Sequence, residues 1–133
     1  KINDHMAIYA SNEILKILSK KKIKQKSKIL ILGYTFKENC SDYRNTQIKK
    51  IKDLISKTYN NLDIFDPYIK EKIGKNFLTS FPSIKNYYDC IIIAVPHRYF
   101  ENKQKQIIKI GNQNCLFFDL KSKMKNINNQ WNL

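Results

Sequence analysis

The residues of this 133-residue chain that could do chemistry are concentrated in one loop-like stretch, GYTFKENCSDYRNT, at positions 33–46. It carries the cations Lys37 and Arg44, with the carboxylates Glu38 and Asp42 between them. Ammonium and guanidinium groups bind phosphate oxygens, the guanidinium through a planar fork of donors. The stretch therefore indicates a phosphate-type anion site, in which Asp42 either orients Arg44 through a local ion pair or stabilises the turn.

Other chemistries have weaker support in the sequence. Cys40 could act as a nucleophile only with a base beside it, and neither His5 nor His97 can be placed there from sequence. The dinucleotide fingerprint G-x-G-x-x-G is absent, since the glycines are Gly33, Gly74 and Gly111. We therefore do not expect backbone N–H groups to cradle a pyrophosphate in the usual way.

The elements that must position this loop follow from short apolar runs. Runs at 29–32, 62–65, 89–95 and 115–118 predict buried strands. A helix is expected at 4–20, on an apolar stripe that includes Met6, Tyr9 and Ile14. A second helix is expected to begin after a Thr46 cap, and a third at 98–110. A loop or helical turn is expected over 68–86. Strand–helix alternation predicts an α/β fold, a Rossmann-like three-layer sandwich with a mainly parallel sheet, preceded by a long helix.

Ligands of such sheets bind at the carboxyl ends of the strands. Four segments are expected to reach that edge: 33–46, 66–68, 96–99 and 119–121. Together they supply a cationic rim with some carboxylates. Within it His97 could touch a ligand or be a satisfied loop histidine, and Asp66 could hold a ribose or simply make the Asp66–Pro67 turn.

The stretch ILGYTFKENCSDYRNT (31–46) resembles the UDP-binding, C-terminal domain of the UDP-glucose/GDP-mannose dehydrogenase family, which carries a G-x-x-F-K-x-x-x-x-D-x-R-x-[ST] segment after its first strand. The variant here is most similar to the branch that oxidises UDP-N-acetylhexosamines. Four further segments agree in order and spacing: KINDHM (1–6), IFDPY (64–68), YDCIIIAVPHRYF (88–100) and FFDLKSKM (117–124). Ser41 and Tyr43 depart from the branch, which usually has Pro and Leu there.

The resemblance implies roles for particular residues. Phe36 and Lys37 match substrate-binding positions, Lys121 matches a basic substrate-facing position, and Arg44 matches an arginine that reaches the NAD cofactor across a domain cleft. No catalytic and no metal-binding residue is expected in this chain. The intact enzyme, by resemblance, removes two hydrides from C6 of a UDP-sugar, through a thiohemiacetal and a thioester on a cysteine, for surface polysaccharide biosynthesis.

The resemblance also implies a domain organisation. Residues 1–24, with Asn3 and Asp4 near their start, match the end of the inter-domain helix that builds a homodimer, and residues 25–133 match the UDP-sugar-binding domain. The N-terminal NAD-binding domain and the nucleophile are expected upstream and absent from this chain. We therefore expect the chain alone to have no dehydrogenase activity.

Composition leaves two alternatives to this interpretation. The formal charge is +14, yet 23 of the 25 basic residues are lysines and only Arg44 and Arg98 are arginines. Specific nucleic-acid readers rely on arginine for bidentate contacts, and an AT-rich genome would also enrich lysine, so no specific nucleic-acid partner is expected. A stand-alone basic anion- or nucleic-acid-binding module and an inactive remnant stay open as alternatives.

Cysteine usage and hydropathy bear on the compartment. No apolar run approaches the roughly 18 residues of a membrane span, so no membrane partner is expected. Cys40, Cys90 and Cys115 show neither a metal-ligand spacing nor a pairing pattern, which favours a reducing compartment, the cytoplasm.

Overall fold

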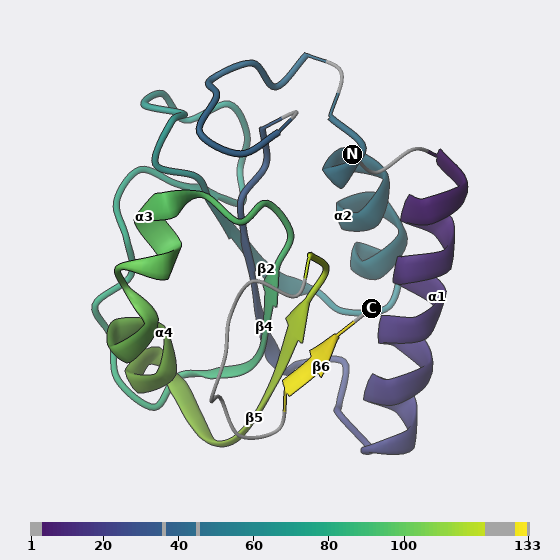
Figure 1. Cartoon of the computed structure of the whole chain (residues 1–133). Helices are drawn as coiled ribbons and strands as arrows, with labels where there is room; N and C mark the ends of the chain where they lie inside the picture. Colours follow the sequence, from purple (N-terminus) through teal and green to yellow (C-terminus); the bar gives the residue numbers. More distant parts are fainter. Residues whose placement is uncertain (1–3, 36, 45, 122–129, 133) are drawn as a thin grey trace.

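The chain forms one parallel sheet between two layers of helices. The computed structural model describes residues 4–35, 37–44, 46–121 and 130–132. Its elements are α1 (Asp4–Lys20), β1 (Lys28–Leu32), α2 (Ile48–Ser56), β2 (Asn61–Phe65), β3 (Phe77–Leu78), β4 (Tyr88–Ile93), α3 (Arg98–Glu101), α4 (Gln104–Ile110), β5 (Gly111–Asp119) and β6 (Gln130–Asn132). Helices α1 and α2 cover one face of the sheet, and α3 and α4 cover the other (Figure 1). The predicted Rossmann-like sandwich with a preceding long helix is confirmed.

Alternation along the strands divides the core into two halves. In β1, Ile29 and Ile31 pack into the half-core beneath α1 and α2, whereas Leu30 and Leu32 pack into the half-core beneath α3 and α4. All four side chains are fully buried. This is why the strand is a continuous apolar run: successive side chains point to opposite faces, and both faces are covered.

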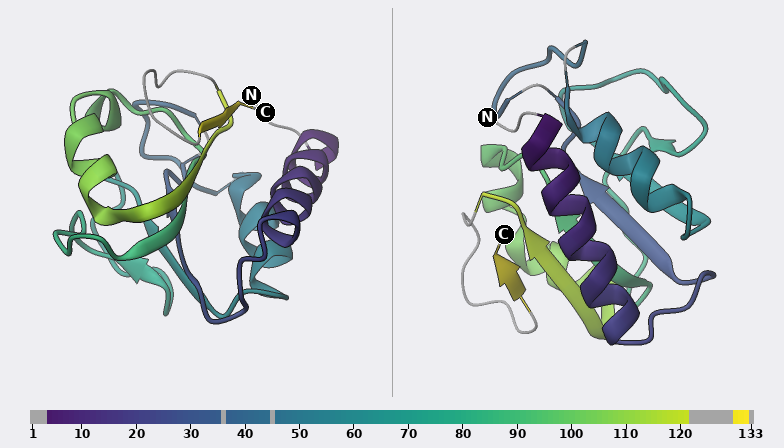
Figure 2. Two further views of the ribbon diagram at one scale, coloured as in Figure 1. Left: turned by 90° about the horizontal axis from the view of Figure 1, so that it is seen from below. Right: turned by 90° about the vertical axis from the view of Figure 1, so that its right-hand side faces the viewer.

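The strand order reverses its direction in the middle of the sheet. The order is β3-β2-β1-β4-β5-β6, with every described pairing parallel. After β1 the chain crosses through α2 to β2 on one side; after β4 it crosses through α3 and α4 to β5 on the other (Figure 2). The order therefore reverses between β1 and β4, and in open α/β sheets the crevice at such a reversal is where ligands bind.

Several local predictions were wrong. The helix expected over 98–110 is two short helices separated at Asn102 and Lys103. The segment 68–86 is mostly loop, one of the two possibilities expected, but it also contains the edge strand β3. Strand β4 ends at Ile93, two residues early, whereas β5 begins at Gly111 and is longer than expected.

The outer face of α1 also differs from the prediction. Met6 and Tyr9 were expected on its apolar stripe, yet they are 50% and 56% exposed, because Ala7, Ala10 and Ile14 supply the buried face. Asn3, which the resemblance places near the start of the inter-domain helix segment, lies outside the described residues. None of the described helices has the length and apolarity that a bilayer span requires.

Candidate functional site

The loops that leave β1, β2, β4 and β5 meet at the carboxyl edge of the sheet, as the sequence predicts. Backbone hydrogen bonds extend the sheet into these loops: Gly33 N–H donates to the Phe65 carbonyl (2.8 Å), Ala94 N–H to the Leu32 carbonyl (2.9 Å) and Leu120 N–H to the Ile93 carbonyl (3.1 Å). The start of the loop 33–46 therefore lies at the carboxyl edge of the sheet, where the strand order reverses between β1 and β4.

A buried carboxylate anchors the start of that loop. The Oδ2 atom of Asp66 accepts hydrogen bonds from the backbone N–H groups of Tyr34 (2.6 Å) and Thr35 (3.1 Å), and Oδ1 accepts one from Tyr68 N–H (2.8 Å). Burial alone would raise the pKa of Asp66, but hydrogen bonds from His97 and from these N–H groups outweigh it and lower the pKa below the ordinary 3.8. Asp66 is thus an ionised structural anchor at the end of β2, and its turn with Pro67 is only part of its role.

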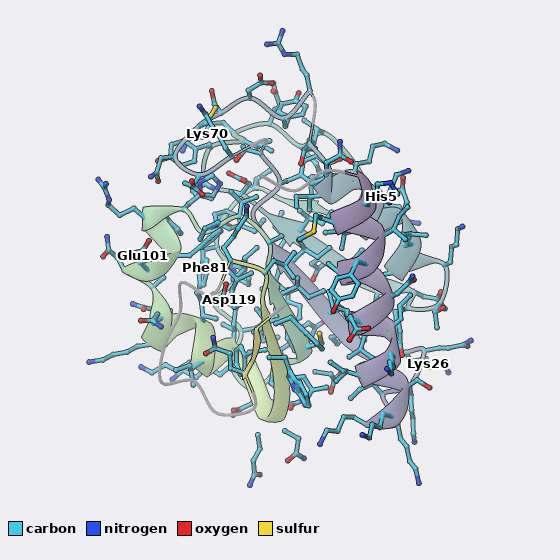
Figure 3. All side chains as sticks on the ribbon, turned by 45° about the vertical axis from the view of Figure 1, so that its right-hand side comes forward. His5, Lys26, Lys70, Phe81, Glu101 and Asp119 are labelled. Atoms are coloured by element: carbon cyan, nitrogen blue, oxygen red, sulfur yellow. The ribbon has the colours of Figure 1, made fainter. Side chains whose placement is uncertain are left out.

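The sequence left two possibilities for His97: contact with a ligand, or a loop histidine whose hydrogen bonds are all satisfied. The structure favours the second. His97 is 0% exposed, and its Nε2 lies 2.9 Å from Asp66 Oδ2 and 3.1 Å from Thr35 Oγ1. Its Nδ1 accepts the backbone N–H of Asn39 (2.8 Å). Both ring nitrogens are therefore engaged, and His97 is not available as a base for Cys40. The other histidine, His5, is exposed on α1 (Figure 3).

The two cations of the loop are both presented to solvent. Lys37 is exposed, and its carbonyl accepts a hydrogen bond from Thr35 Oγ1 (2.9 Å). The Arg44 side chain is 83% exposed and its Nε and Nη2 donate to the two oxygens of Asp42, at 3.2 and 3.3 Å. The hydrogen bond from Arg44 lowers the pKa of Asp42. The ion pair considered from the sequence is present, and it fixes Arg44 locally while leaving part of its donor fork open.

The remaining predicted site residues lie on other segments. Lys121 is half-buried after β5, where its backbone N–H donates to Oδ1 of Asp119 (3.1 Å). Asp119 is fully buried, in the interior at the end of β5 (Figure 3). Phe36 lies outside the described residues. Lys121 and Lys37 thus reach the same edge of the sheet from strands on opposite sides of β4.

The loop ends where the sequence predicts a helix cap. The hydroxyl of Thr46 accepts the N–H of Ile48, the first residue of α2 (3.1 Å), and lies 3.5 Å from the Thr35 carbonyl. Thr46 thus satisfies one of the otherwise unpaired N–H groups at the helix start. It also ties the end of the loop back to its beginning, so both ends of the cation-bearing segment are fixed.

A groove of about 700 Å³ between α2 and the β3 edge is a second anion candidate. It is lined by Tyr34, Tyr43, Arg44, Lys49, Lys52, Asn60, Ile73, Gly74, Lys75, Asn76 and Phe77. Lys49 and Lys52 are ion-paired with Asp53 at 2.9 and 3.4 Å, and Arg44 with Asp42. Because Arg44 lines it, this groove lies beside the end of the loop 33–46.

Two other kinds of site find no support in the structure. In the part of the chain that is described, no three His, Cys, Asp or Glu side chains are grouped so that they could hold a metal ion. Nitrogen-tipped side chains project around the whole outline of the molecule, with Lys26 and Lys70 at opposite ends (Figure 3). A nucleic-acid module would instead gather its cations on one face.

Comparison with known proteins agrees with the family resemblance of the sequence. Residues 30–126 match the model of the UDP-glucose/GDP-mannose dehydrogenase family, UDP binding domain. The chain is 36% identical over 126 residues to UDP-N-acetyl-D-glucosamine 6-dehydrogenase of Salmonella typhi, and 34% identical over 127 residues to Protein CapL of Staphylococcus aureus. These matches cover 91% of the chain and 30% of each relative, so the chain spans about a third of their length.

Solved structures support the fold. UDP-D-ManNAc dehydrogenase from Pyrococcus horikoshii is similar with a TM-score of 0.72 at 22% identity, over 94% of this chain and 29% of that one. The UDP-N-acetyl-mannosamine dehydrogenase Cap5O from S. aureus is similar with a TM-score of 0.74 at 20% identity, over 98% of this chain and 30% of that one.

Proposed function

This chain belongs to the UDP-glucose/GDP-mannose dehydrogenase family and corresponds to its C-terminal, UDP-binding domain, and on that premise we propose that it is the nucleotide-sugar-binding portion of an NAD-dependent UDP-sugar 6-dehydrogenase. The substrate class we propose is a UDP-N-acetylhexosamine or UDP-glucose, oxidised to the uronic acid for surface polysaccharide. One observation carries the proposal: the loop with Lys37 and Arg44 leaves β1 at the point where the strand order reverses, and is anchored there by Asp66.

We assign separate roles to the cations. Lys37, exposed at the start of the loop, binds the anionic part of the nucleotide sugar, and Lys121 approaches it from the end of β5. Phe36 is assigned to the same site by its match to a substrate-binding position of the family. Arg44 reaches phosphate oxygens of NAD across a cleft closed by another domain. Its ion pair with Asp42 supports this role, because a guanidinium held at one edge still has donors for a second anion.

The partners we propose follow the same premise. An N-terminal NAD-binding domain supplies most of the cofactor site and the nucleophile. Residues 1–24, of which Asp4–Lys20 are α1, correspond to the end of the helix that joins it to the domain of residues 25–133, and this helix builds a homodimer. The exposure of Met6, Ile8 and Tyr9 on the outer face of α1 supports an interface there. We place the enzyme in the cytoplasm, because Cys40, Cys90 and Cys115 are all free.

UDP binding by the 133-residue chain tests the proposal directly. Titration of the ¹⁵N-labelled chain with UDP should perturb the amides of 33–46 and 119–121 more than those at the amino ends of the strands. Lys37→Ala should weaken UDP binding by about 1.5–3 kcal/mol, the range for a charge-assisted hydrogen bond. Lys26→Ala is the matched control, since Lys26 is an equally exposed lysine just before β1, at the opposite edge of the sheet. If Lys37→Ala and Lys26→Ala lose the same affinity for UDP, lysines act only through general electrostatic attraction and the role assigned to Lys37 is wrong.

Kinetics test the whole-enzyme assignment. A chimera in which this chain replaces the matching part of the S. typhi relative should oxidise its UDP-sugar, whereas the chain alone should produce no NADH. In the chimera, Lys37→Ala should raise KM for the UDP-sugar and Arg44→Ala should mainly weaken NAD use, while Cys40→Ser should leave turnover nearly intact. Loss of turnover in Cys40→Ser with normal kinetics in the other two variants would show that the loop is wrongly assigned.

A further inference from the structure

Three side chains from three neighbouring strands meet beneath the loop. Thr35 follows β1, Asp66 follows β2 and His97 follows β4, and their exposed fractions are 0, 2 and 0%. Asp66 and His97 lie 31 and 62 residues after Thr35 in the chain, yet His97 Nε2 is within hydrogen-bond distance of both Thr35 Oγ1 and Asp66 Oδ2. The cluster spans the point where the strand order reverses, so it connects the two halves of the sheet at the proposed site.

The hydrogen bonds define one tautomer of His97. Its Nδ1 faces the backbone N–H of Asn39 at 2.8 Å, and this N–H can only donate, so Nδ1 carries no hydrogen. The hydrogen of the neutral ring is then on Nε2, where Asp66 Oδ2 and Thr35 Oγ1 accept it. Thr35 can accept because its own hydroxyl hydrogen is donated to the Lys37 carbonyl (2.9 Å). Each polar group in the cluster is satisfied by this single arrangement.

The ring thereby holds the segment of the loop that carries Lys37. Asn39 has a left-handed backbone, with φ of 56°, and it is bound twice: its N–H to His97 Nδ1, and its Oδ1 to the N–H of Arg98 (3.0 Å). The carbonyl of Lys37 itself accepts the Thr35 hydroxyl bond, two residues before this attachment. An exposed lysine on a loop would otherwise have to be ordered each time a ligand binds, at a cost in conformational entropy.

We infer that His97 is a positioning residue of the nucleotide-sugar site, which fixes the Lys37–Asn39 segment for binding through the unprotonated Nδ1 of its Nε2–H tautomer. This inference rests on the proposed function for its ligand, but the hold on the loop is a separate claim about Asn39. His97 touches neither ligand nor solvent in this role. Its effect on binding passes through the backbone of the loop, which distinguishes it from Lys37.

Two substitutions at position 97 separate the role of the ring in the loop from its role in the core. In His97→Asn the side-chain amide oxygen takes the place of Nδ1 and can still accept the Asn39 N–H, but the side chain is too short to reach Asp66. In His97→Gln the amide nitrogen can reach Asp66, but nothing replaces Nδ1. The full 133-residue chain is used, with urea unfolding, hydrogen exchange of the Asn39 amide, ¹⁵N shifts of the His97 ring and the Kd for UDP as readouts.

We expect the Asn39 amide to stay protected in His97→Asn and to exchange faster in His97→Gln. UDP affinity should fall about tenfold in His97→Gln, a loss of preorganisation, and should be largely rescued in His97→Asn even if that variant is the less stable of the two. The ring ¹⁵N shifts of the wild type should show Nδ1 unprotonated. Affinity that follows stability in both variants, or a protonated Nδ1 in the neutral ring, would overturn the inference.

A third variant keeps the test decisive if the changes at position 97 prevent folding. Asn39→Gly retains the N–H and the left-handed backbone but loses the acceptor for Arg98 N–H, and Asn39 is exposed, so the core is untouched. Because its N–H still donates to His97 Nδ1, this variant should keep the amide of residue 39 protected and should lose far less than tenfold in UDP affinity. A tenfold loss would mean that the Asn39–Arg98 bond, and not the His97 ring, holds the loop, and would overturn the inference. If the wild type itself does not bind UDP, the proposed function fails, while the exchange of the Asn39 amide still decides whether His97 holds the loop.

Discussion

Gly33 and Val95 lie so close together that a Cβ atom added to Gly33 would fall 2.6 Å from the Cβ and 2.7 Å from the backbone nitrogen of Val95. Gly33 follows β1, Val95 follows β4, and the φ angle of Gly33 is +98°, a conformation that residues with a side chain rarely adopt. The one glycine of the loop is therefore required for the approach of two strand ends, not for contact with a phosphate.

Gly33→Ala should destabilise the protein by more than about 1 kcal/mol, because both the backbone conformation and the contact with Val95 oppose a methyl group. Urea unfolding followed by circular dichroism measures the change. Gly74→Ala is the comparison: its new Cβ would meet only side-chain atoms of Phe77, at 2.9 Å, and no left-handed backbone is involved. A Gly33 variant as stable as the Gly74 variant would contradict this account of the crevice.

Thiol reactivity should divide the three cysteines into two classes. Cys40 is partly exposed, whereas Cys90 and Cys115 are buried, and burial, assisted by Asp89, raises the pKa of Cys115 to about 12. Since the thiolate is the reactive species, a disulfide reagent at neutral pH should modify one thiol quickly in the folded chain and all three in urea. Cys40→Ser should remove the fast phase. A fast phase that persists in this variant would mean that the core opens at β4 or β5.

The strands could be predicted from the sequence because short runs such as Ile29–Leu32 can be buried only between two helical layers. The buried face of α1 could not be predicted in the same way, because Met6 and Tyr9 fit the helical period as well as Ala7 does. Periodicity identifies an apolar stripe, but the strands beneath it select which residues fit, and small side chains pack more closely. Likewise, β6 requires the free edge of β5, which no local pattern around Trp131 reveals.

For the site, the sequence predicts which segments meet but not which side chains bond. The carboxyl ends of parallel strands converge by topology, so the four loops could be foreseen. The hydrogen-bond partners of His97 could not be foreseen, because Asp66 and Thr35 are distant in sequence and only the strand order shows that they are neighbours. A polar residue just after each of three apolar strands was the available signal. The ligand roles of Lys37, Arg44 and Lys121 stay predictions.

A buried tyrosine should make stability fall at alkaline pH. Tyr88 is buried and its hydroxyl donates to Asp63 Oδ2 (2.7 Å); burial first, and this bond second, raise its pKa well above 10. A raised pKa contributes stability that is complete below pH 10 and is lost as the pH rises towards the folded-state value. Tyr88→Phe should cost about 1.5–3 kcal/mol at neutral pH, as for a bond to a charged group, and should flatten the alkaline decline.

Tyr9→Phe is the control for that measurement, since Tyr9 is 56% exposed on α1. It should change neither the stability at neutral pH nor the alkaline slope measurably. Urea unfolding at several pH values between 7 and 11 gives both quantities. If Tyr88→Phe and the wild type decline in parallel above pH 10, the alkaline loss comes from other groups and the Tyr88–Asp63 bond does not contribute to it.

Acid should weaken the anchor of the loop through Asp66. The pKa of this carboxyl is lowered in the folded state, so the unfolded chain binds its proton first as the pH falls. The contribution of Asp66 to stability is therefore present above about pH 3.8 and is lost as the pH falls through the folded-state pKa.

Asp66→Asn should be about 1.5–3 kcal/mol less stable at pH 7, because one amide oxygen cannot replace two carboxylate oxygens that accept from Tyr34, Thr35, Tyr68 and His97. Below pH 3.8 the difference from the wild type should shrink, which urea unfolding between pH 7 and 2.5 measures. Asp42→Asn is the matched control, a partly exposed carboxylate whose pKa is also lowered, and it should shift the acid profile less. A constant difference between Asp66→Asn and the wild type across the whole range would mean that folding does not lower the pKa of Asp66, and the proposed stabilisation of its charge beneath Lys37 would be wrong.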